Sequence, residues 1–305
     1  MDERPSIPLL MSILNVTPDS FSDGGRYMEI DAATARGERM LEEGADIVDV
    51  GGESTRPGAA PVPAEEQVRR VVPVIQRLAP RVQRGAAPWA ARRTISVDTT
   101  SARVAAAALD AGATIVNDVS AGRDDPSMFD VVAARGAGIV LMHRLVPPAQ
   151  DSYSDRHASP PRYRDVVADV VAFLRERVDA AAGAGVPHDA ICIDPGLGFG
   201  KSVDQNLELL GRTDELLDAH PRVLIGASRK SFLAAAASAG EPAARAAIGP
   251  AERLPGSLAA AVIAALRGAA VLRVHDVSAT RQALAVASAA AFHRRSPHGS
   301  VSRGL

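Results

Sequence analysis

Residues 94–119 read TISVDTTSARVAAAALDAGATIVNDV, and they contain the unit from which the fold follows. A short apolar run is followed by an alanine-rich segment, which closes at Gly112, and then by a second apolar run. Short continuous apolar runs suit strands that are buried on both faces, whereas the segment at 101–111 has the composition and the closing glycine of a helix. The stretch therefore predicts two parallel strands joined by a helix.

The same unit recurs along the whole chain. Eight apolar runs rich in Ile, Val and Leu lie at 9–16, 46–52, 94–99, 114–119, 138–143, 190–196, 222–228 and 271–277. Segments of helical composition stand between them, among them 31–44, 101–111, 163–183 and 258–268. We expect an Asp cap at the start of the 31–44 helix. Because strand and helix alternate, the sequence predicts a parallel α/β fold.

A doubly wound sheet could also contain eight strands, so the polar residues must decide between an open sheet and a barrel. Nearly every run ends with side chains that can bind or react: Asn15, Asp49 with Glu53, Asp98, Asn117 with Asp118, His143, Asp194, Arg229 with Lys230, and Arg273 with His275. An open sheet needs such residues only near its switch point, whereas all eight strand ends of a barrel meet at one mouth. We therefore predict a single-domain (β/α)8 TIM barrel over residues 1–305, with its core at about 9–290 and a flexible tail at about 294–305.

Composition and charge narrow the class of protein. Of the 305 residues, 47% are hydrophobic and 23% are charged, and a chain of this length can bury a large core without disulfides. The single cysteine, Cys192, lies in an apolar run and is expected in the core. A formal net charge of −2 argues against general nucleic-acid binding. Without a long apolar stretch or a signal peptide, we expect a cytoplasmic enzyme that does not bind membranes.

Three connections are longer than usual. Residues 80–93 are predicted to form a surface insertion at the end of the barrel opposite the polar side chains. Residues 145–162 and 238–255 are rich in Pro with Ser, Asp, Ala or Gly. Loops of this length are either functional lids or tolerated surface excursions.

Two glycine-containing segments follow the first two predicted strands. NVTPDSFSDGG (15–25) begins with Asn15, whose carbonyl oxygen suits Mg²⁺, although an Asn cap and a turn would also explain it. In GGESTRPGA (51–59), the glycines let the backbone approach a ligand, while Thr55 and Arg56 offer a hydroxyl and a guanidinium to an anion. These segments predict a metal site and an anion site near the mouth.

Asp98, Asn117 and Asp194 end three different predicted strands. Two carboxylates and an amide in one cavity can pair with a heterocycle that carries amino and ring N–H groups. Each residue taken alone could instead cap a helix. Three of them at buried strand ends favour a ligand, because a buried carboxylate is costly without a partner.

Basic side chains follow the last strands. Lys230 could reach a carbonyl or ring nitrogen of the heterocycle, or neutralise phosphate charge. Arg273 and His275 are two residues apart on one strand, so they point to the same face, and if that face is the barrel interior they form an anion site for phosphoryl oxygens. Lys201 is either a functional cation or a solvated charge of the loop.

Taken together, these segments resemble the dihydropteroate synthase family of pterin-binding enzymes, the target of sulfonamides. The resemblance runs from Ile13 to about Ala285 and rests on NVTPDSFSDGG, GGESTRPGA, SVDT, VNDVS, LMH, DPGLGFGK, ASRKS and RVHDV in this order. It implies a barrel, a homodimer, and the joining of 6-hydroxymethyl-7,8-dihydropterin diphosphate to 4-aminobenzoate with loss of diphosphate.

The resemblance also implies roles for individual residues. The pterin would be held by Asp98, Asn117, Asp194 and Lys230, with Met142 and Phe199 as pocket walls. Mg²⁺ would bind Asn15, and the diphosphate would contact Thr55, Arg56, Arg273 and His275. Phe21, Pro57 and Ser228 would border the aminobenzoate. Lys230, Arg273, His275 and Arg56 would take part in catalysis.

The fifth loop departs from the family pattern, because a second Met and a Gly-x-Pro are replaced after LMH by RLVPPAQDSYSD (144–155). The resemblance therefore implies neither a conformation for this loop nor a fine specificity. Two other functions stay open. A methyltransferase domain that binds methyltetrahydrofolate would need no diphosphate site, and an inactive paralogue would keep the fold without turnover.

Overall fold

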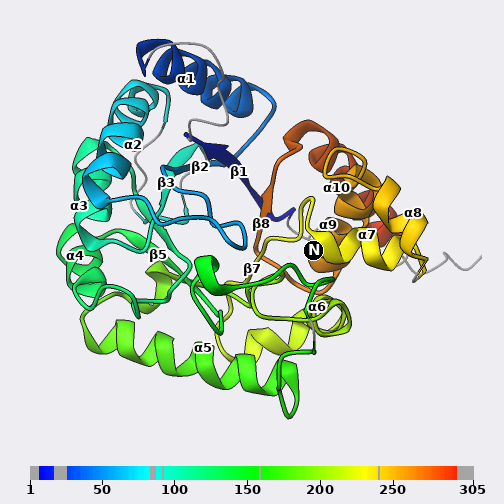
Figure 1. The fold of residues 1–305 in the computed structure, drawn as a ribbon. Coiled ribbons are helices and arrows are strands. Elements are labelled where there is room, and N and C mark those ends of the chain that lie inside the picture. The colour runs from blue at the N-terminus through cyan, green and yellow to red at the C-terminus, as the bar shows by residue number, and fades with distance from the viewer. Residues whose placement is uncertain are drawn as a thin grey trace, which may run out of the picture.

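The computed structural model describes residues 7–16, 26–82, 87–90, 93–157, 159–239 and 241–293 (Figure 1). Within these ranges, eight parallel strands form one sheet in the order β6-β5-β4-β3-β2-β1-β8-β7. Its strands are β1 (Leu9–Asn15), β2 (Ile47–Gly51), β3 (Thr94–Asp98), β4 (Ile115–Asp118), β5 (Gly138–Met142), β6 (Ile191–Asp194), β7 (Leu224–Ile225) and β8 (Val271–Val274). A parallel bridge between Ile193 and Val223 joins β6 to β7, so the sheet closes into the predicted barrel.

Helices surround the strands on the outside of the barrel (Figure 1). The α-helices are α1 (Arg26–Glu42), α2 (Ala64–Leu78), α3 (Ala102–Ala111), α4 (Met128–Arg135), α5 (Val166–Gly183), α6 (Val203–Gly211), α7 (Ser231–Ala237), α8 (Pro242–Ala247), α9 (Leu254–Leu266) and α10 (Val277–His293). Short 3-10 helices are η2 (Ala79–Arg81), η3 (Pro148–Gln150), η4 (His188–Ala190) and η5 (Thr213–Asp218). The tail predicted at 294–305 lies outside the described residues.

Local sequence explains where several helices begin and end. The helix predicted at 101–111 is α3, and Gly112 ends it with a φ of 123°, a conformation that an L-residue with a side chain rarely adopts. Asp165 caps α5 by accepting hydrogen bonds from the backbone N–H groups of Val167 and Ala168. The Asp cap predicted for the first helix is wrong, because α1 begins at Arg26 and Asp31 lies inside it.

The amino-terminal half of the barrel interior is apolar. A layer of buried side chains fills it: Met11, Ile47, Ile115, Val140, Cys192, Leu224 and Val271. Cys192 is fully buried, as predicted. A larger apolar layer lies between the strands and the surrounding helices. With this end packed, a ligand can enter only from the carboxyl ends of the strands.

Trp89 closes the amino-terminal end of the barrel. Its side chain is 6% exposed and packs against the interior layer, and its indole Nε1 donates a hydrogen bond of 2.8 Å to the carbonyl of Ala190. The prediction that 80–93 is only a surface insertion is therefore wrong at this residue. An indole supplies the large apolar area and the single donor that this position requires.

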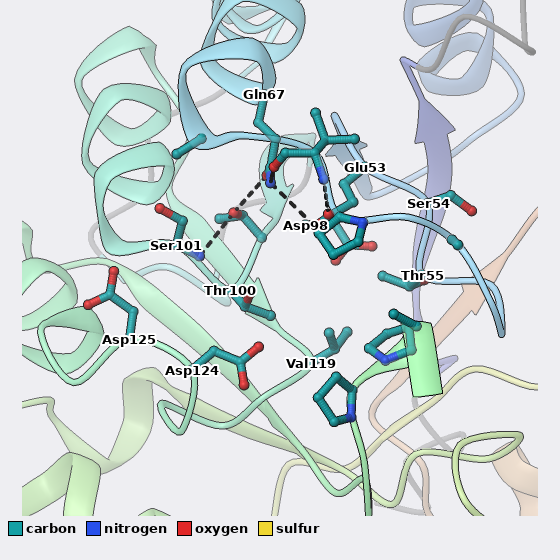
Figure 2. Close-up of a pocket in the computed structure, with 18 of the residues that line it drawn as sticks. Glu53, Ser54, Thr55, Gln67, Asp98, Thr100, Ser101, Val119, Asp124 and Asp125 are labelled. Carbon is teal, nitrogen blue, oxygen red and sulfur yellow. Dashed lines mark hydrogen bonds between the residues drawn. The ribbon is translucent and has the colours of Figure 1, made fainter. Parts of the chain in front are cut away.

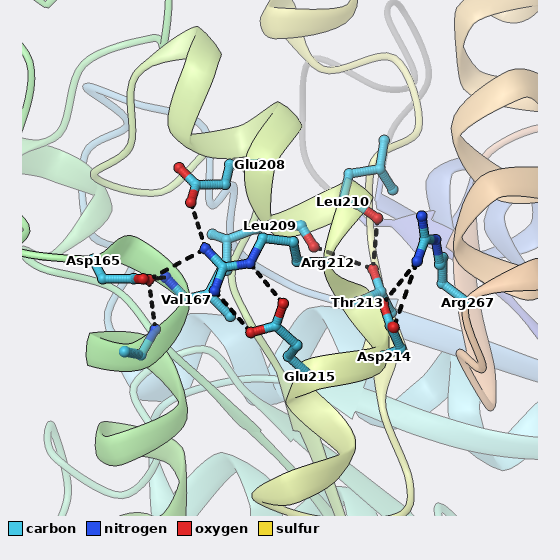
Figure 3. A network of polar contacts seen from close by, with 11 residues as sticks. Asp165, Val167, Glu208, Leu209, Leu210, Arg212, Thr213, Asp214, Glu215 and Arg267 are labelled. Atoms are coloured by element: carbon cyan, nitrogen blue, oxygen red, sulfur yellow. Dashed lines mark hydrogen bonds and ion pairs between the residues drawn. The ribbon is translucent and has the colours of Figure 1, made fainter.

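Arg212 joins three elements on the outside of the barrel (Figure 3). Its guanidinium contacts Glu215 twice at 2.7 Å, Glu208 at 2.6 Å and Asp165 at 3.5 Å. These carboxylates belong to η5, to α6 and to the cap of α5. Single exposed ion pairs contribute little, but one guanidinium shared by three carboxylates fixes the three segments relative to one another.

In the part of the chain that the structure describes, we find no helix with the length and apolar character needed to cross a bilayer.

Replacing Trp89 with Ala should lower the free energy of unfolding by about 3–5 kcal/mol, because it leaves a cavity in a packed interior. Trp89→Phe keeps most of the apolar contact and loses the hydrogen bond to Ala190, so its cost should be smaller, about 1–2 kcal/mol. Urea unfolding followed by far-ultraviolet circular dichroism measures both, since Trp89 is the only tryptophan of the chain. Equal midpoints for wild type and Trp89→Ala would mean that Trp89 does not close the barrel.

Candidate active site

The polar strand ends meet at one mouth of the barrel, where the structure contains a cavity of roughly 270 Å³. Nine of the residues predicted as site residues line it: Asn15, Thr55, Arg56, Pro57, Phe199, Ser228, Lys230, Arg273 and His275. They come from the ends of β1, β2, β6 and β7 and from β8 with its end. The predicted aminobenzoate contact Phe21 lies outside the described residues.

Asp49 is the centre of a buried ion cluster below this cavity. Its Oδ2 accepts hydrogen bonds from Asn117 Nδ2 at 3.0 Å and from Arg273 Nε at 2.7 Å. Arg273 Nη2 also donates to Asp98 Oδ2 at 2.7 Å. Asp49 is fully buried, and its Oδ1 has no hydrogen-bond partner among the described residues. Asp49 thus joins two residues of the predicted pterin site and the arginine of β8.

Asp49 stands at a predicted strand end, but no role was predicted for it. A signal was present in the alternation of side chains along β2. Ile47 belongs to the layer inside the barrel, so Asp49, two residues further, points inward as well. An aspartate that points into a closed barrel needs a cation, and Arg273 supplies it.

Burial raises the pKa of Asp98 to about 7. The positive charge of Arg273 opposes this increase, and the negative charge of Asp49 adds to it. One guanidinium therefore faces two buried carboxylates. The cluster carries an excess of hydrogen-bond acceptors, which is what an N–H-rich ligand requires.

Asp194 and Lys230 lie on the other side of the mouth. Burial raises the pKa of Asp194, whose Oδ1 accepts a 2.7 Å hydrogen bond from the N–H of Gly196. Burial lowers the pKa of Lys230 to about 8, and the negative charge of Asp194 limits this decrease. Lys230 Nζ donates to the carbonyl of Leu197 and lies 4.6 Å from the centroid of the Phe199 ring.

The predicted pocket walls also come together. Met142 and Phe199, which are 2% and 9% exposed, pack with Val119 in a small apolar cluster. Met142 is paired with Asp194 across β5 and β6. An apolar wall therefore stands directly beside the carboxylate, an arrangement that suits a flat heterocycle with a polar edge.

Lys201 is fully buried, so the prediction of a solvated loop charge is wrong. Its Nζ lies 2.9 Å from the carbonyl of Phe199, 3.0 Å from that of Gly196 and 3.0 Å from His143 Nδ1. Burial lowers the pKa of His143 to about 2, so this imidazole is neutral and its Nδ1 accepts. Lys201 thereby fixes the loop that presents Phe199 to the cavity.

His275 lies at the rim and is held by Ser228. The backbone N–H of His275 donates to Ser228 Oγ at 3.3 Å, and the same Oγ lies 3.0 Å from His275 Nδ1. Burial lowers the pKa of His275 to about 4, and the positive charge of Arg273 adds to this effect. In the tautomer in which the hydroxyl donates to Nδ1, Nε2–H is a neutral donor toward an anion.

Arg273 does not share this position at the rim. Arg273 and His275 were predicted to meet near the top of the barrel if they face its interior, but the guanidinium of Arg273 lies among the buried carboxylates Asp49 and Asp98. It still lines the cavity, so its contact with a diphosphate stays a prediction.

A second cavity of roughly 380 Å³ lies beside the first, over the ends of β2, β3 and β4. Figure 2 shows Glu53, Gln67 and Asp98 on one side of it and Asp124 and Asp125 on the other. Of the residues predicted from the sequence for the pterin, Asp98 is the one that lines it within the described ranges. The smaller cavity contains most of the predicted set and is therefore the candidate active site.

Asn15 offers its side-chain oxygen to the candidate site at the end of β1. Three or more His, Cys, Asp or Glu side chains arranged to hold a metal ion are not found among the described residues. Mg²⁺ does not need such a cage, because it keeps several waters and uses one or two protein oxygens together with substrate phosphates. Asn15 fits that mode of binding.

Replacing Asp49 with Asn should lower the pKa of Asp98, because it removes a neighbouring negative charge from a buried pair. The titration of the Asp98 carboxyl carbon by NMR measures the shift. Glu53→Gln is the matched control, since the effect of Glu53 on Asp98 is weaker than that of Asp49. A pKa of Asp98 that is unchanged in Asp49→Asn would contradict the ion cluster.

Comparison with known proteins gives consistent matches. The family model described as "Pterin binding enzyme" matches residues 11–275. The chain is 46% identical over 280 residues to the dihydropteroate synthase of Mycobacterium leprae and covers 92% of both proteins. It is 45% identical over 280 residues to a probable bifunctional folylpolyglutamate synthase/dihydropteroate synthase of Haloferax volcanii, of which it spans only 30%.

Solved structures of dihydropteroate synthases are also similar to this chain. The dihydropteroate synthase of Xanthomonas albilineans with 4-aminobenzoic acid has a TM-score of 0.78 and 45% identity, with 93% of each chain covered. The same enzyme in complex with 7,8-dihydropteroate has a TM-score of 0.76 and 43% identity, with 93% of this chain and 94% of that chain covered. With a family model that matches most of its length and relatives this similar, the chain belongs to the pterin-binding enzyme family.

Proposed function

We propose that this protein is a dihydropteroate synthase, which condenses 6-hydroxymethyl-7,8-dihydropterin diphosphate with 4-aminobenzoate to give 7,8-dihydropteroate and diphosphate. One observation carries the proposal beyond the family match. Cationic and N–H donors line the cavity of the candidate site, and the buried acceptors Asp98 and Asp194 do not line it but lie next to its Arg273 and Lys230, so donors and acceptors stand together as a pterin that carries a diphosphate requires.

The base of the mouth would hold the pterin. Asp98, Asn117 and Asp194 offer acceptors and an amide to its amino and ring N–H groups, and Lys230 offers a donor to its carbonyl or ring nitrogen. Met142 and Phe199 would cover the ring. Because these groups are buried, each unmatched one would cost free energy, and this cost selects a ligand with a complementary edge.

The rim would bind the diphosphate and stabilise the charge that grows as it leaves. The C–O bond between the pterin methylene and the diphosphate breaks, and the bonding electrons leave with the diphosphate. The aniline nitrogen then forms a bond with the methylene and loses one proton. Arg56, with the neutral Nε2–H of His275 and the hydroxyl of Thr55, supplies donors at the rim, and Arg273 supplies positive charge below it.

We further propose that Mg²⁺ takes part and that Asn15 is its protein ligand. When bound, the ion would supply positive charge to the diphosphate oxygens.

Pro57 and Ser228 would border the 4-aminobenzoate on the outer side of the same cavity, with Lys230 nearby. The role assigned to Phe21 rests on the sequence resemblance.

A homodimer and a cytoplasmic location complete the proposal. Three large apolar side chains are exposed on neighbouring helices, Ile263 at 41% and Leu266 at 62% on α9 and Val286 at 67% on α10. Exposed apolar groups at this density support contact between two copies through α9 and α10.

A diphosphate ester does not cross a lipid bilayer unaided because its charges are costly there, which supports a location where the substrate is made.

Mixing the protein with the pterin diphosphate, 4-aminobenzoate and Mg²⁺ should release one diphosphate for each dihydropteroate formed. No dihydropteroate should form without the amine, and chelation of Mg²⁺ should stop the formation of both products. Asn15→Ala should raise the Mg²⁺ concentration needed for half-maximal rate, because it removes the protein ligand.

Methyl transfer from methyltetrahydrofolate to a cobalamin protein would favour the methyltransferase instead. Pterin binding without diphosphate release would identify an inactive paralogue.

The affinity for pterin should increase as the pH rises through about 7, because the Asp98 carboxyl becomes an ionised acceptor above its raised pKa and is protonated below it. Calorimetric titration with a pterin that lacks phosphate keeps phosphate ionisation out of the measurement. Asp98→Asn should bind more weakly and lose this step. A step that persists in Asp98→Asn belongs to another group.

A further inference from the structure

Side chains of the fifth loop hold the backbone of Gly200 from two sides. Asp151 Oδ2 accepts a 2.9 Å hydrogen bond from the N–H of Gly200. The hydroxyl of Tyr163, just after the loop, donates a 2.9 Å hydrogen bond to the carbonyl of Gly200. Gly200 has a φ of 58°, and a Cβ there would lie 2.9 Å from the Cβ of Leu145. Glycine permits this close approach, so the fifth loop and the loop after β6 are fitted to each other.

Gly200 lies between two residues of the pterin wall. Phe199 lines the cavity of the candidate site, and Lys201 is fully buried behind it. Because both backbone polar groups of Gly200 are hydrogen-bonded, the Phe199 ring cannot turn away from the cavity with its backbone unless these bonds break. Within the described residues, Asp151 does not line this cavity, so it can act on a ligand only through Gly200 and its neighbours.

The same turn of the fifth loop contacts the loop after β2. The carbonyl of Pro148, in η3, accepts a 2.9 Å hydrogen bond from the N–H of Gly58. Gly58 directly follows residues 55–57, which line the candidate site. Residues 148–151 are therefore bonded to both of the loops that bring substrate contacts to the cavity.

The charge of Asp151 also acts on Lys230. Burial lowers the pKa of Lys230 to about 8, and the positive charge of Arg273 adds to this decrease. The negative charges of Asp194, Asp151 and Asp98 oppose the decrease. Asp194 and Asp98 belong to the predicted pterin site, whereas Asp151 comes from the loop that departs from the family pattern. This loop therefore supplies a charge as well as a hydrogen bond.

We propose that Asp151 is a positioning residue of the pterin site, which holds Phe199 against the ring through Gly200 and supports the positive charge of Lys230. The inference rests on the proposed function and assigns a part in it to the fifth loop. Asp151 Oδ1 also accepts a 2.8 Å hydrogen bond from the N–H of Ser152. A residue that only shaped its own loop in this way would have no effect on pterin binding.

Two substitutions separate the hydrogen bond from the charge. Asp151→Ala removes both, whereas Asp151→Asn keeps an acceptor oxygen for Gly200 and removes the charge. The probe is 6-hydroxymethyl-7,8-dihydropterin, which carries no phosphate, and calorimetry measures its binding across the pH range. Near neutral pH, the Kd should rise about fivefold in Asp151→Ala, as for the loss of one hydrogen bond, and by less in Asp151→Asn. The KM for 4-aminobenzoate should stay within about twofold in both variants.

The pH dependence tests the charge. In the wild type, the affinity for the pterin should fall as the pH rises through about 8, where Lys230 loses its proton. Asp151→Asn should move this fall to lower pH, because the loss of a nearby negative charge favours the neutral lysine.

Asp169→Ala is the control variant, since Asp169 Oδ2 accepts a 3.0 Å hydrogen bond from the backbone N–H of Arg164 at the start of α5. It should leave the Kd and its pH dependence unchanged. A wild-type Kd in Asp151→Ala, or a fall at the same pH in Asp151→Asn, would overturn the inference. If Asp151→Ala does not fold, the titration of Asp151→Asn decides alone. If the wild type binds the pterin but releases no diphosphate from its diphosphate ester, the proposed function fails, while the binding comparison still tests Asp151.

Discussion

Two buried carboxylates, Asp49 and Asp98, share the guanidinium of Arg273 in the interior of the barrel, and the arrangement of the mouth depends on this contact. The removal of a carboxylate from water costs several kcal/mol without a partner, and Arg273 is the partner of both acids. Two carboxylates that share one guanidinium have more acceptor positions than the guanidinium fills. Asn117 donates to one of them, and a ligand with N–H groups can donate to others. The residues that recognise a heterocycle are therefore the same residues that the ion cluster holds in place.

The opposite wall depends on a second buried cation. Lys201 is held by two backbone carbonyls and a neutral His143, and these bonds fold the loop after β6 so that Phe199 and the carbonyl of Leu197 face Lys230. Gly196 has a φ of 68°, and a Cβ there would lie 1.9 Å from the carbonyl oxygen of His143. Only glycine allows this approach, so the loop and the end of β5 are fitted to each other.

The two ends of the barrel have different roles, since the amino-terminal end is packed for stability and the carboxyl end contains the candidate active site. Apolar side chains and Trp89 fill the amino-terminal end, while charged groups gather at the carboxyl end. Because the carboxyl ends lead into long loops, the outer site can change without disturbance of the packed end. The fifth loop is an example. It adds Tyr153 to the active-site wall and Arg156 to a neighbouring cavity that Arg245 and Arg253 also line, while β5 is paired in register with β4 and β6.

Apolar periodicity and terminal glycines are local signals, so they were enough to predict the eight strands and the helices between them. The meeting of the polar strand ends followed from closure of the barrel. Which groups contact one another was decided only by the tertiary structure. Asp49, Asp98 and Arg273 are separated by up to 224 residues, so the sequence could not show that one guanidinium serves both acids. The burial of Lys201 and of Trp89 likewise depends on neighbours from other strands. For that reason Lys201 was left open between a functional cation and a solvated charge, and Trp89 was expected in a surface insertion.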